Sequence, residues 1–308
     1  LVLESSDPEN EKSTQGGMMF AVPISIVADR HADLPFPKEL PPFVAEVAQS
    51  LKPGPLLRRV AEQQKLPEAA GDPESLQMAV AGHMLRGGIP RTNQILLQLR
   101  TLLEVKMAES ILCCAGSLWV HEDAAATLAR AVTPPAAAAV VINAARDDTA
   151  WRYLHRAGYP IYGHPGWTRF VEVMTTPPGE RQAEGLLAAT RELLQHRFKC
   201  EAAEIAGELA YAAERGEPVF AVIPPPPPAA KAFATLRREY PTVSFVLLAG
   251  EALADEMGKA FGDIVMLKPS IDKDIEERNF NSYTRTREAL VRFFADQPPP
   301  GATTERLA

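Results

Sequence analysis

The chain has 308 residues, 46% of them hydrophobic, and it carries a formal net charge of −7 at pH 7. This length and apolar content are enough for two domain cores of ordinary size. The acidic balance, with no dense stripe of Lys and Arg, argues against nucleic-acid binding, because such binding depends on neutralising phosphates. No uninterrupted apolar run approaches the roughly 18 residues of a membrane-spanning helix, so no membrane partner is expected.

Residues 1–17 are polar and acidic, without the basic start and apolar centre of a secretion signal, and they are expected to form a disordered lead-in. The three cysteines include the adjacent Cys113 and Cys114, a pattern that does not make a disulfide framework. Reduced thiols in a cytoplasmic protein are therefore expected. The six histidines contain no pair at the i, i+4 spacing of a helical zinc site, so neither a metal nor a cofactor is expected.

An apolar, β-rich run at residues 18–28 predicts a strand, with Asp29 and His31 just past its end. From about 40 to 106, apolar residues recur at spacings of three and four, which predicts several helices. Shorter segments follow, and together they predict an N-terminal α/β domain over 18–166 with a helical insertion. The strands expected after the insertion are 110–115, 137–144 and 159–163, and the helices are 121–132 and 147–158.

The second half alternates short apolar runs with amphipathic segments, which predicts a doubly wound parallel sheet of five strands covered by helices on both faces. This α/β domain is expected over 167–297 and is followed by a proline-rich tail at 298–308. The expected strands are 170–176, 199–203, 218–223, 242–250 and 263–269, and the expected helices are 180–198, 204–216, 229–240, 251–262 and 284–297.

Five βα units, with a two-residue polar corner after the first strand and Lys-Pro after the fifth, resemble the receiver domain of response regulators. The resemblance implies the strand order 2-1-3-4-5 and a pocket at the carboxyl edge of the sheet. In that family the pocket holds an acidic pair, an aspartate that accepts phosphate, a hydroxyl residue and a lysine. The matching positions here are Thr175 and Thr176 for the acidic pair, Ile223 (or Pro224) for the aspartate, Ala249 for the hydroxyl and Lys268, followed by Pro269, for the lysine.

The substitutions at these positions remove the chemistry that the resemblance would otherwise imply. Phosphoryl transfer to a carboxylate needs that carboxylate and a magnesium ion, and magnesium prefers carboxylate oxygens. Two threonines and an isoleucine supply neither, so the pocket is expected to be inert.

Two other interpretations of the fold stay open. The second half also fits one lobe of a periplasmic-binding-type or sugar-binding protein. The first half contains a weaker echo of the receiver pattern, with Asn143 at the hydroxyl position and His164 before Pro165 at the Lys-Pro position, which would make the chain a tandem of two degenerate receivers.

The leading hypothesis is a non-catalytic regulatory or scaffold protein that acts by binding another protein or a second copy of itself. Receiver-like domains associate through the face of the fourth helix, fifth strand and fifth helix, where exposed aromatic side chains would indicate an interface and buried ones a core. The candidate interface residues are Met257, Phe261, Tyr283, Leu290, Phe293 and Phe294. The alternative is a two-lobed Rossmann-like enzyme or small-ligand-binding protein with a site in the cleft between its lobes. The residues lining that cleft from opposite sheets would be Asp29, His31, Asn143, His164 and Lys268.

Overall fold

The computed structural model describes residues 41–132, 137–158, 171–174, 183–250, 261 and 264–295. All of them belong to one compact unit within Phe36–Ala308. The strands expected at 18–28 and 159–163 and most of the helix expected at 251–262 lie outside the described residues. So do the candidate site residues Asp29, His31, His164, Thr175, Thr176 and Met257.

The first part of the described chain is helical, as expected, but it continues well past residue 106. Proline and capping residues set many of the helix starts: Asp72 accepts hydrogen bonds from the amides of Glu74 and Ser75, and Pro73 occupies the first turn. The elements are α1 (Pro41–Ser50), α2 (Pro55–Gln63), η2 (Pro67–Ala70), α3 (Pro73–Arg86), α4 (Gly88–Leu99), η3 (Arg100–Leu102), α5 (Val105–Ser117) and α6 (Glu122–Ala131).

The prediction of a strand at 110–115 is wrong, because these residues form the middle of α5. Ile111 and Cys114 are fully buried and Leu112 and Ala115 nearly so, which means that this segment is surrounded by other helices on most sides. A short uninterrupted apolar run fits a buried helix as well as a buried strand, so the pattern could not separate the two.

The sheet is entirely parallel in its described strands. Its body consists of β2 (Val171–Met174), β3 (Val219–Ile223), β4 (Val243–Leu248) and β1 (Ala139–Ile142), in that order, and the two-residue β5 (Val265–Met266) pairs with β1 at the edge. The strands expected near 137–144, 170–176, 218–223 and 242–250 are therefore confirmed.

The strand order corrects the expected division of the chain. Because β1 lies between β4 and β5, the sheet takes strands from both sides of residue 166, and the expected boundary there cuts through it. No strand forms at 199–203, where the mostly exposed residues turn directly from one helix into the next. The resulting order β2-β3-β4-β1-β5 differs from the order 2-1-3-4-5 of a receiver. The alternation of strands and helices predicts an α/β fold but not which strands become neighbours.

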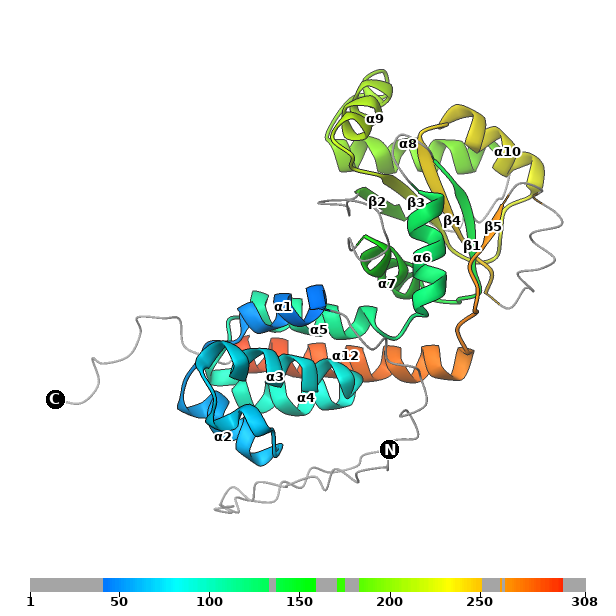
Figure 1. The fold of residues 1–308 in the computed structure, drawn as a ribbon. Coiled ribbons are helices and arrows are strands. Elements are labelled where there is room, and N and C mark those ends of the chain that lie inside the picture. Colours follow the sequence, from blue (N-terminus) through cyan, green and yellow to red (C-terminus); the bar gives the residue numbers. More distant parts are fainter. Residues whose placement is uncertain are drawn as a thin grey trace, which may run out of the picture. The chain divides into compact units, whose positions relative to one another are not determined.

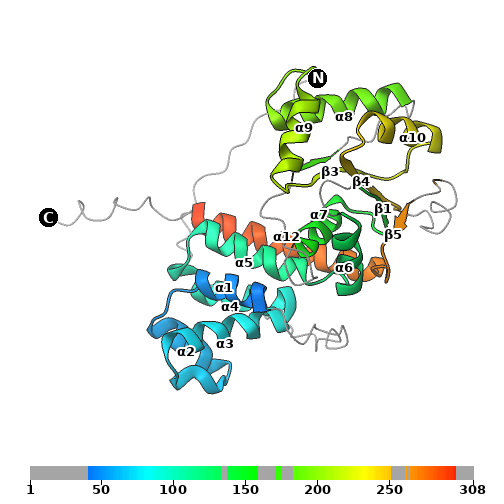
Figure 2. The same ribbon diagram turned by 45° about the horizontal axis from the view of Figure 1, so that its top comes forward.

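Alternate residues of the strands face two separate cores, as the period of two requires. One face carries Val140, Phe220 and Val246 and packs against α7 (Asp147–Ala157). The other packs against α8 (Ala183–Phe198), α9 (Ile205–Glu214) and α10 (Ala230–Glu239). The helices on this second face lie beside β3 and β4 in Figure 2.

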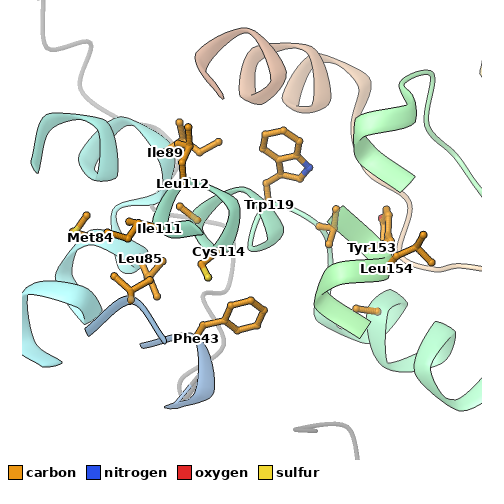
Figure 3. Packing of buried hydrophobic residues seen from close by; sticks show 14 of the residues in the cluster. Phe43, Met84, Leu85, Ile89, Ile111, Leu112, Cys114, Trp119, Tyr153 and Leu154 are labelled. Carbon is orange, nitrogen blue, oxygen red and sulfur yellow. The ribbon is translucent and has the colours of Figure 1, made fainter. Parts of the chain in front are cut away.

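The first of these cores is shared between the sheet and the helical part. Figure 3 shows it extending from Phe43 of α1 and Leu85 of α3, through Ile111 of α5, to Tyr153 of α7. The helical segment is thus not an independent insertion, because its apolar faces are buried together with one face of the sheet.

The C-terminal helix α12 (Lys273–Ala295) packs against α4 and α5 (Figure 1). It begins well before the expected helix at 284–297, because the Asp272 carboxylate accepts hydrogen bonds from the amides of Asp274 and Ile275 and so caps its first turn. Among the described residues, no helix is both long enough and apolar enough to cross a lipid bilayer.

Candidate functional site

The carboxyl ends of β1 and β4 mark the place where a parallel sheet of this kind offers a ligand site. The chain leaves β1 toward the face covered by α7, whereas it reaches β4 from α10 on the opposite face. The two strands are neighbours, so the direction of winding reverses between them. Ligands of open α/β sheets bind at this switch point, outside the carboxyl ends of the strands.

The described candidate residues do gather along this edge. Ile223 ends β3, Ala249 follows β4, Asn143 follows β1 and Lys268 follows β5. Ile223 and Ala249 are buried, with 2% and 1% of their surface exposed, and Lys268 is exposed. The residues assigned to a degenerate phospho-pocket are therefore apolar and closed off where a phospho-acceptor and a hydroxyl would be needed.

Asn143 and Lys268 do not face each other across a cleft from opposite sheets, as the two-lobed alternative expected. The strands that precede them are neighbours, with Val141 paired to Met266, and the Leu267 amide donates to the Val141 carbonyl at 3.1 Å. Both residues therefore belong to the edge of a single sheet.

At the switch point, the segments that follow β1 and β4 are joined by backbone hydrogen bonds and leave no gap for a ligand between them. The Ala249 amide donates to the Ile142 carbonyl and the Gly250 amide to the Ala144 carbonyl, each at 2.9 Å. Gly250 has φ +62°, and a Cβ atom there would lie 2.6 Å from Cβ of Pro225. Only glycine fits this close approach, and the amides that could have met a ligand are used within the sheet.

The N-terminus of α7, which follows β1 at this edge, is occupied by the Glu276 carboxylate of α12. Glu276 accepts hydrogen bonds from the Ala145 amide at 3.1 Å, the Arg146 amide at 3.2 Å and the Thr149 hydroxyl at 2.5 Å. Glu276 is only 2% exposed. Free amides and the helix dipole make a helix N-terminus a site for phosphate and other anions. Here the protein supplies that anion itself.

Further contacts fasten the same turn to α12. The guanidinium of Arg146 lies 4.1 Å from the ring centre of Phe280, and its Nη2 lies 4.0 Å from Oε1 of Glu277. Residues 143–146 contain no glycine, so the loop also lacks the flexible backbone that phosphate-binding turns use.

One turn later on α7, Arg152 lies among aromatic rings. Its guanidinium is 4.0 Å from the ring centre of Tyr283, 4.7 Å from that of Trp151 and 5.4 Å from that of Trp119, and the residue is 2% exposed. Arg152 Nη1 also donates to Sγ of Cys113 at 3.6 Å. The side chain joins α5, α7 and α12 through packing and cation–π contact.

Ser117, which is buried, and His155, which is partly buried, form a second polar pair. Ser117 Oγ lies 2.8 Å from Nδ1 of His155 and 3.0 Å from the Cys113 carbonyl. Burial lowers the pKa of His155 to about 4, although Glu46 acts in the opposite direction. A nucleophile needs a base and access to substrate, and Ser117 is completely buried. The distance between Ser117 Oγ and His155 Nδ1 is the only feature that the pair shares with a catalytic dyad. Its hydrogen bond links α5 to α7.

The cysteines and acidic residues supply no metal centre among the described residues, where no group of three His, Cys, Asp or Glu side chains converges. None of Cys113, Cys114 and Cys200 forms a disulfide. Burial raises the pKa of the Cys113 thiol to about 11, so this sulfur is a protonated core group and not a reactive thiolate.

The described candidate interface residues are engaged within the chain. Leu290 is buried, and Tyr283 and Phe294 pack against the core shared by the helices and the sheet. Phe261 packs against Phe233 in the other core, with ring centres 5.2 Å apart. Phe293 contacts Phe294 and lies under the guanidinium of Arg100. These side chains accordingly stabilise the fold and do not form an exposed aromatic patch.

Sequence reasoning missed Glu276 and Arg152, the two charged residues that organise this region. Glu276 meets residues about 130 positions earlier in the chain, and no local spacing signals such a contact. Comparisons with protein-family models, with curated proteins and with solved structures find no match to this chain.

Proposed function

We propose that this chain is a non-catalytic regulatory or scaffold protein that acts by binding other proteins. The observation that carries the proposal is the Glu276 carboxylate, which fills the N-terminus of α7 at the switch point of the sheet. This is where an α/β enzyme or nucleotide-binding protein would hold an anionic group of its ligand.

A phosphate ligand would have to displace a buried carboxylate that already has three hydrogen bonds. Without displacement, the phosphate would lie close to a carboxylate that is only 2% exposed, and the two negative charges would repel each other. Both routes weaken binding, so the edge supports a structural role more than a ligand-binding one.

The receiver resemblance supports the proposal only through the groups that phosphorylation would require and that are missing here. Phosphorylation would need a carboxylate at the position of Ile223 and a hydroxyl at that of Ala249, and both residues are buried and apolar. None of Cys113, Cys114 and Cys200 forms a disulfide, which is typical of proteins in a reducing compartment, and we propose a cytoplasmic location on this basis.

Two assays on the full chain test the proposal. Incubation with acetyl phosphate and Mg²⁺, followed by intact-mass measurement, is expected to leave the mass unchanged. A thermal-shift screen with nucleotides, nucleotide sugars and simple sugars is expected to leave the melting temperature unchanged, because a ligand that binds only the folded state would raise it. A stoichiometric phosphoryl adduct, or a saturable rise in melting temperature, would establish a ligand site and overturn the proposal.

A further inference from the structure

A hollow of about 380 Å³ lies at the amino ends of β1 and β4, at the opposite edge of the sheet from the candidate site. This volume is at the lower end of the range for ligand pockets, about 300–1,000 Å³. The segments that line the hollow are the approach to β1, the second half of α10 and the start of β4. The lining residues that matter below are Ala138, Ala234, Arg238, Tyr240, Val243 and Phe245.

Much of this lining is apolar and belongs to the core between the sheet and α8, α9 and α10. Val243 and Phe245 of β4 are 2% and 1% exposed and are part of that core together with Tyr240. The ring of Phe245 packs against that of Phe233 on α10, with ring centres 5.7 Å apart. The lining is therefore fixed by core packing, and it favours an apolar side chain over a hydrated polar group.

Tyr240 adds one polar group to this apolar lining. The residue is only 5% exposed, yet its hydroxyl makes no hydrogen bond with any described residue and keeps contact with solvent. A buried tyrosine usually finds a hydrogen-bond partner for its hydroxyl, which can both donate and accept. This hydroxyl is accordingly available to a ligand, and the N–H and C=O groups of a peptide backbone both suit it.

Arg238 is the cation that a ligand in the hollow would meet. It is exposed and forms no ion pair or hydrogen bond with the described part of the chain, while the carboxylate of the neighbouring Glu239 lies 3.8 Å from Arg191. Arg237 also lines the hollow but already interacts within the chain, so its charge is not counted. None of the described lining residues is acidic. A guanidinium without a counterion favours a carboxylate or phosphate group.

The apolar lining separates a peptide from a nucleic acid as the source of that anion. A phosphodiester chain carries a charge at every unit and has no aliphatic side chain to place against Val243 and Phe245, whereas a peptide can present an apolar and an acidic side chain together. The net charge of −7 also opposes the approach of a long polyanion. Sheets of this class hold their small-molecule ligands at the carboxyl edge, so a hollow at the amino edge suits protein binding better.

We infer that this hollow binds a short segment of a protein partner in which an apolar side chain lies close to a carboxylate. The apolar side chain packs against Val243 and Phe245, Arg238 pairs with the carboxylate, and the Tyr240 hydroxyl bonds to the peptide backbone. In an extended peptide, side chains two positions apart lie on the same side, about 7 Å from each other. The hollow thus selects an acidic residue two positions from an apolar one. This inference rests on the proposed function and names the chemistry of its partner.

Fluorescence polarisation with the full chain tests it. The probe is a fluorescein-labelled peptide in which a Glu-Ser-Leu-Ser-Glu core is flanked by glycine and serine, so that a carboxylate lies two positions from the leucine in either chain direction. Saturable binding is expected. A Gln-Ser-Leu-Ser-Gln peptide lacks the carboxylates and a Glu-Ser-Ser-Ser-Glu peptide lacks the apolar side chain, and each is expected to bind at least about tenfold more weakly.

Variants of the chain locate the binding. Arg238→Glu is expected to weaken it about tenfold or more, because a charge-assisted hydrogen bond is replaced by repulsion. Tyr240→Phe is expected to weaken it about threefold or more at an unchanged melting temperature, because the hydroxyl has no partner among the described residues. Lys231→Glu is the matched control, since Lys231 is exposed on the same helix but does not line the hollow. Its binding constant should stay within about twofold of the unmodified chain.

An unchanged melting temperature shows that each variant folds, and Tyr240→Phe decides the question if Arg238→Glu does not. Absence of peptide binding, equal binding of the three peptides, or equal loss in Arg238→Glu and Lys231→Glu would overturn the inference. So would self-association of the chain that Arg238→Glu abolishes, because the occupant would then be a second copy. These results leave the proposed function standing, because that fails separately, through the phosphodonor and nucleotide assays.

Discussion

The carboxylate of Glu276 on α12 accepts a hydrogen bond of 2.5 Å from the hydroxyl of Thr149 on α7, and this bond joins the two helices. The same carboxylate holds the amides of Ala145 and Arg146. One buried side chain therefore caps α7, fixes the start of α12 against the sheet and fills the position where a ligand anion would bind.

Removing the Glu276 carboxylate should destabilise the fold. Glu276→Ala leaves two partly buried amides and the buried Thr149 hydroxyl without their acceptor, at a cost of roughly 2 kcal/mol in unfolding free energy. Glu277→Ala is the control. Glu277 is exposed, and its Oε1 is as far as 4.0 Å from Nη2 of Arg146, so its loss should change the unfolding free energy by less than about 0.5 kcal/mol. Urea denaturation of both variants measures the difference, and equal stabilities would contradict the capping role.

Gly250 should not tolerate alanine. Its φ of +62° disfavours any side chain, and a Cβ atom would lie 2.6 Å from Cβ of Pro225. Gly216 has a similar φ of +68° but open space around it, so it isolates the backbone effect. We expect Gly216→Ala to cost about 1 kcal/mol and Gly250→Ala about 1–3 kcal/mol more, because an overpacked contact is added. Similar unfolding free energies for the two variants would show that Gly250 and Pro225 are not tightly packed against each other.

The free energy of unfolding should decrease as the pH is lowered, because His155 takes up a proton. Burial lowers its pKa from about 6.5 to about 4, so the unfolded chain binds the proton more tightly than the folded one. The stabilising contribution is complete above pH 6.5 and is lost as the pH falls from about 6.5 to about 4, for a total of roughly 3 kcal/mol.

His155→Gln keeps a polar side chain of similar reach but does not titrate in this range. The difference between its unfolding free energy and that of the unmodified chain, followed from pH 7 to pH 4, isolates the histidine from the other titrating groups. A difference that stays constant with pH would mean that His155 is not buried as a neutral side chain.

Arg152 should act mainly by filling space between aromatic rings. Arg152→Ala removes a buried side chain from between Tyr283, Trp151 and Trp119 and should cost roughly 3 kcal/mol. Arg152→Met keeps most of the volume without a buried charge, so a cost of about 1 kcal/mol or less is expected. Thermal unfolding compares the two, and a methionine variant as unstable as the alanine variant would show that the charge is essential.

Much of the sheet could be predicted from the sequence, because β3 is an uninterrupted apolar run and β4 is apolar except for Ser244, which is typical of strands buried on both faces. The same signal misled at 110–115, where a short apolar run belongs to a helix buried on most sides. At 199–203 the expected strand is instead a turn between α8 and α9 whose residues are mostly exposed, and a short segment between two helices carries too little pattern to separate the two.

The edge residues could be predicted in part for a geometrical reason. Parallel strands end at the same edge, so Ile223, Ala249 and Lys268 all lie along the carboxyl edge of one sheet, although β1 separates Lys268 from the other two. The neighbour relation between β1 and β4 could not be predicted, since it depends on pairing across more than a hundred residues. Glu276 lies beyond the reach of local patterns for the same reason.

The protein's own Glu276 carboxylate occupies the switch point, and the amides of Ala145 and Arg146 report on it directly. Amide-resolved NMR of the full chain should show both amides protected from hydrogen exchange, and Glu276→Ala should remove that protection. Millimolar ATP, NAD or UDP-glucose should leave both resonances of the unmodified chain in place. Saturable shifts of these two amides on addition of any of the three ligands would contradict the account.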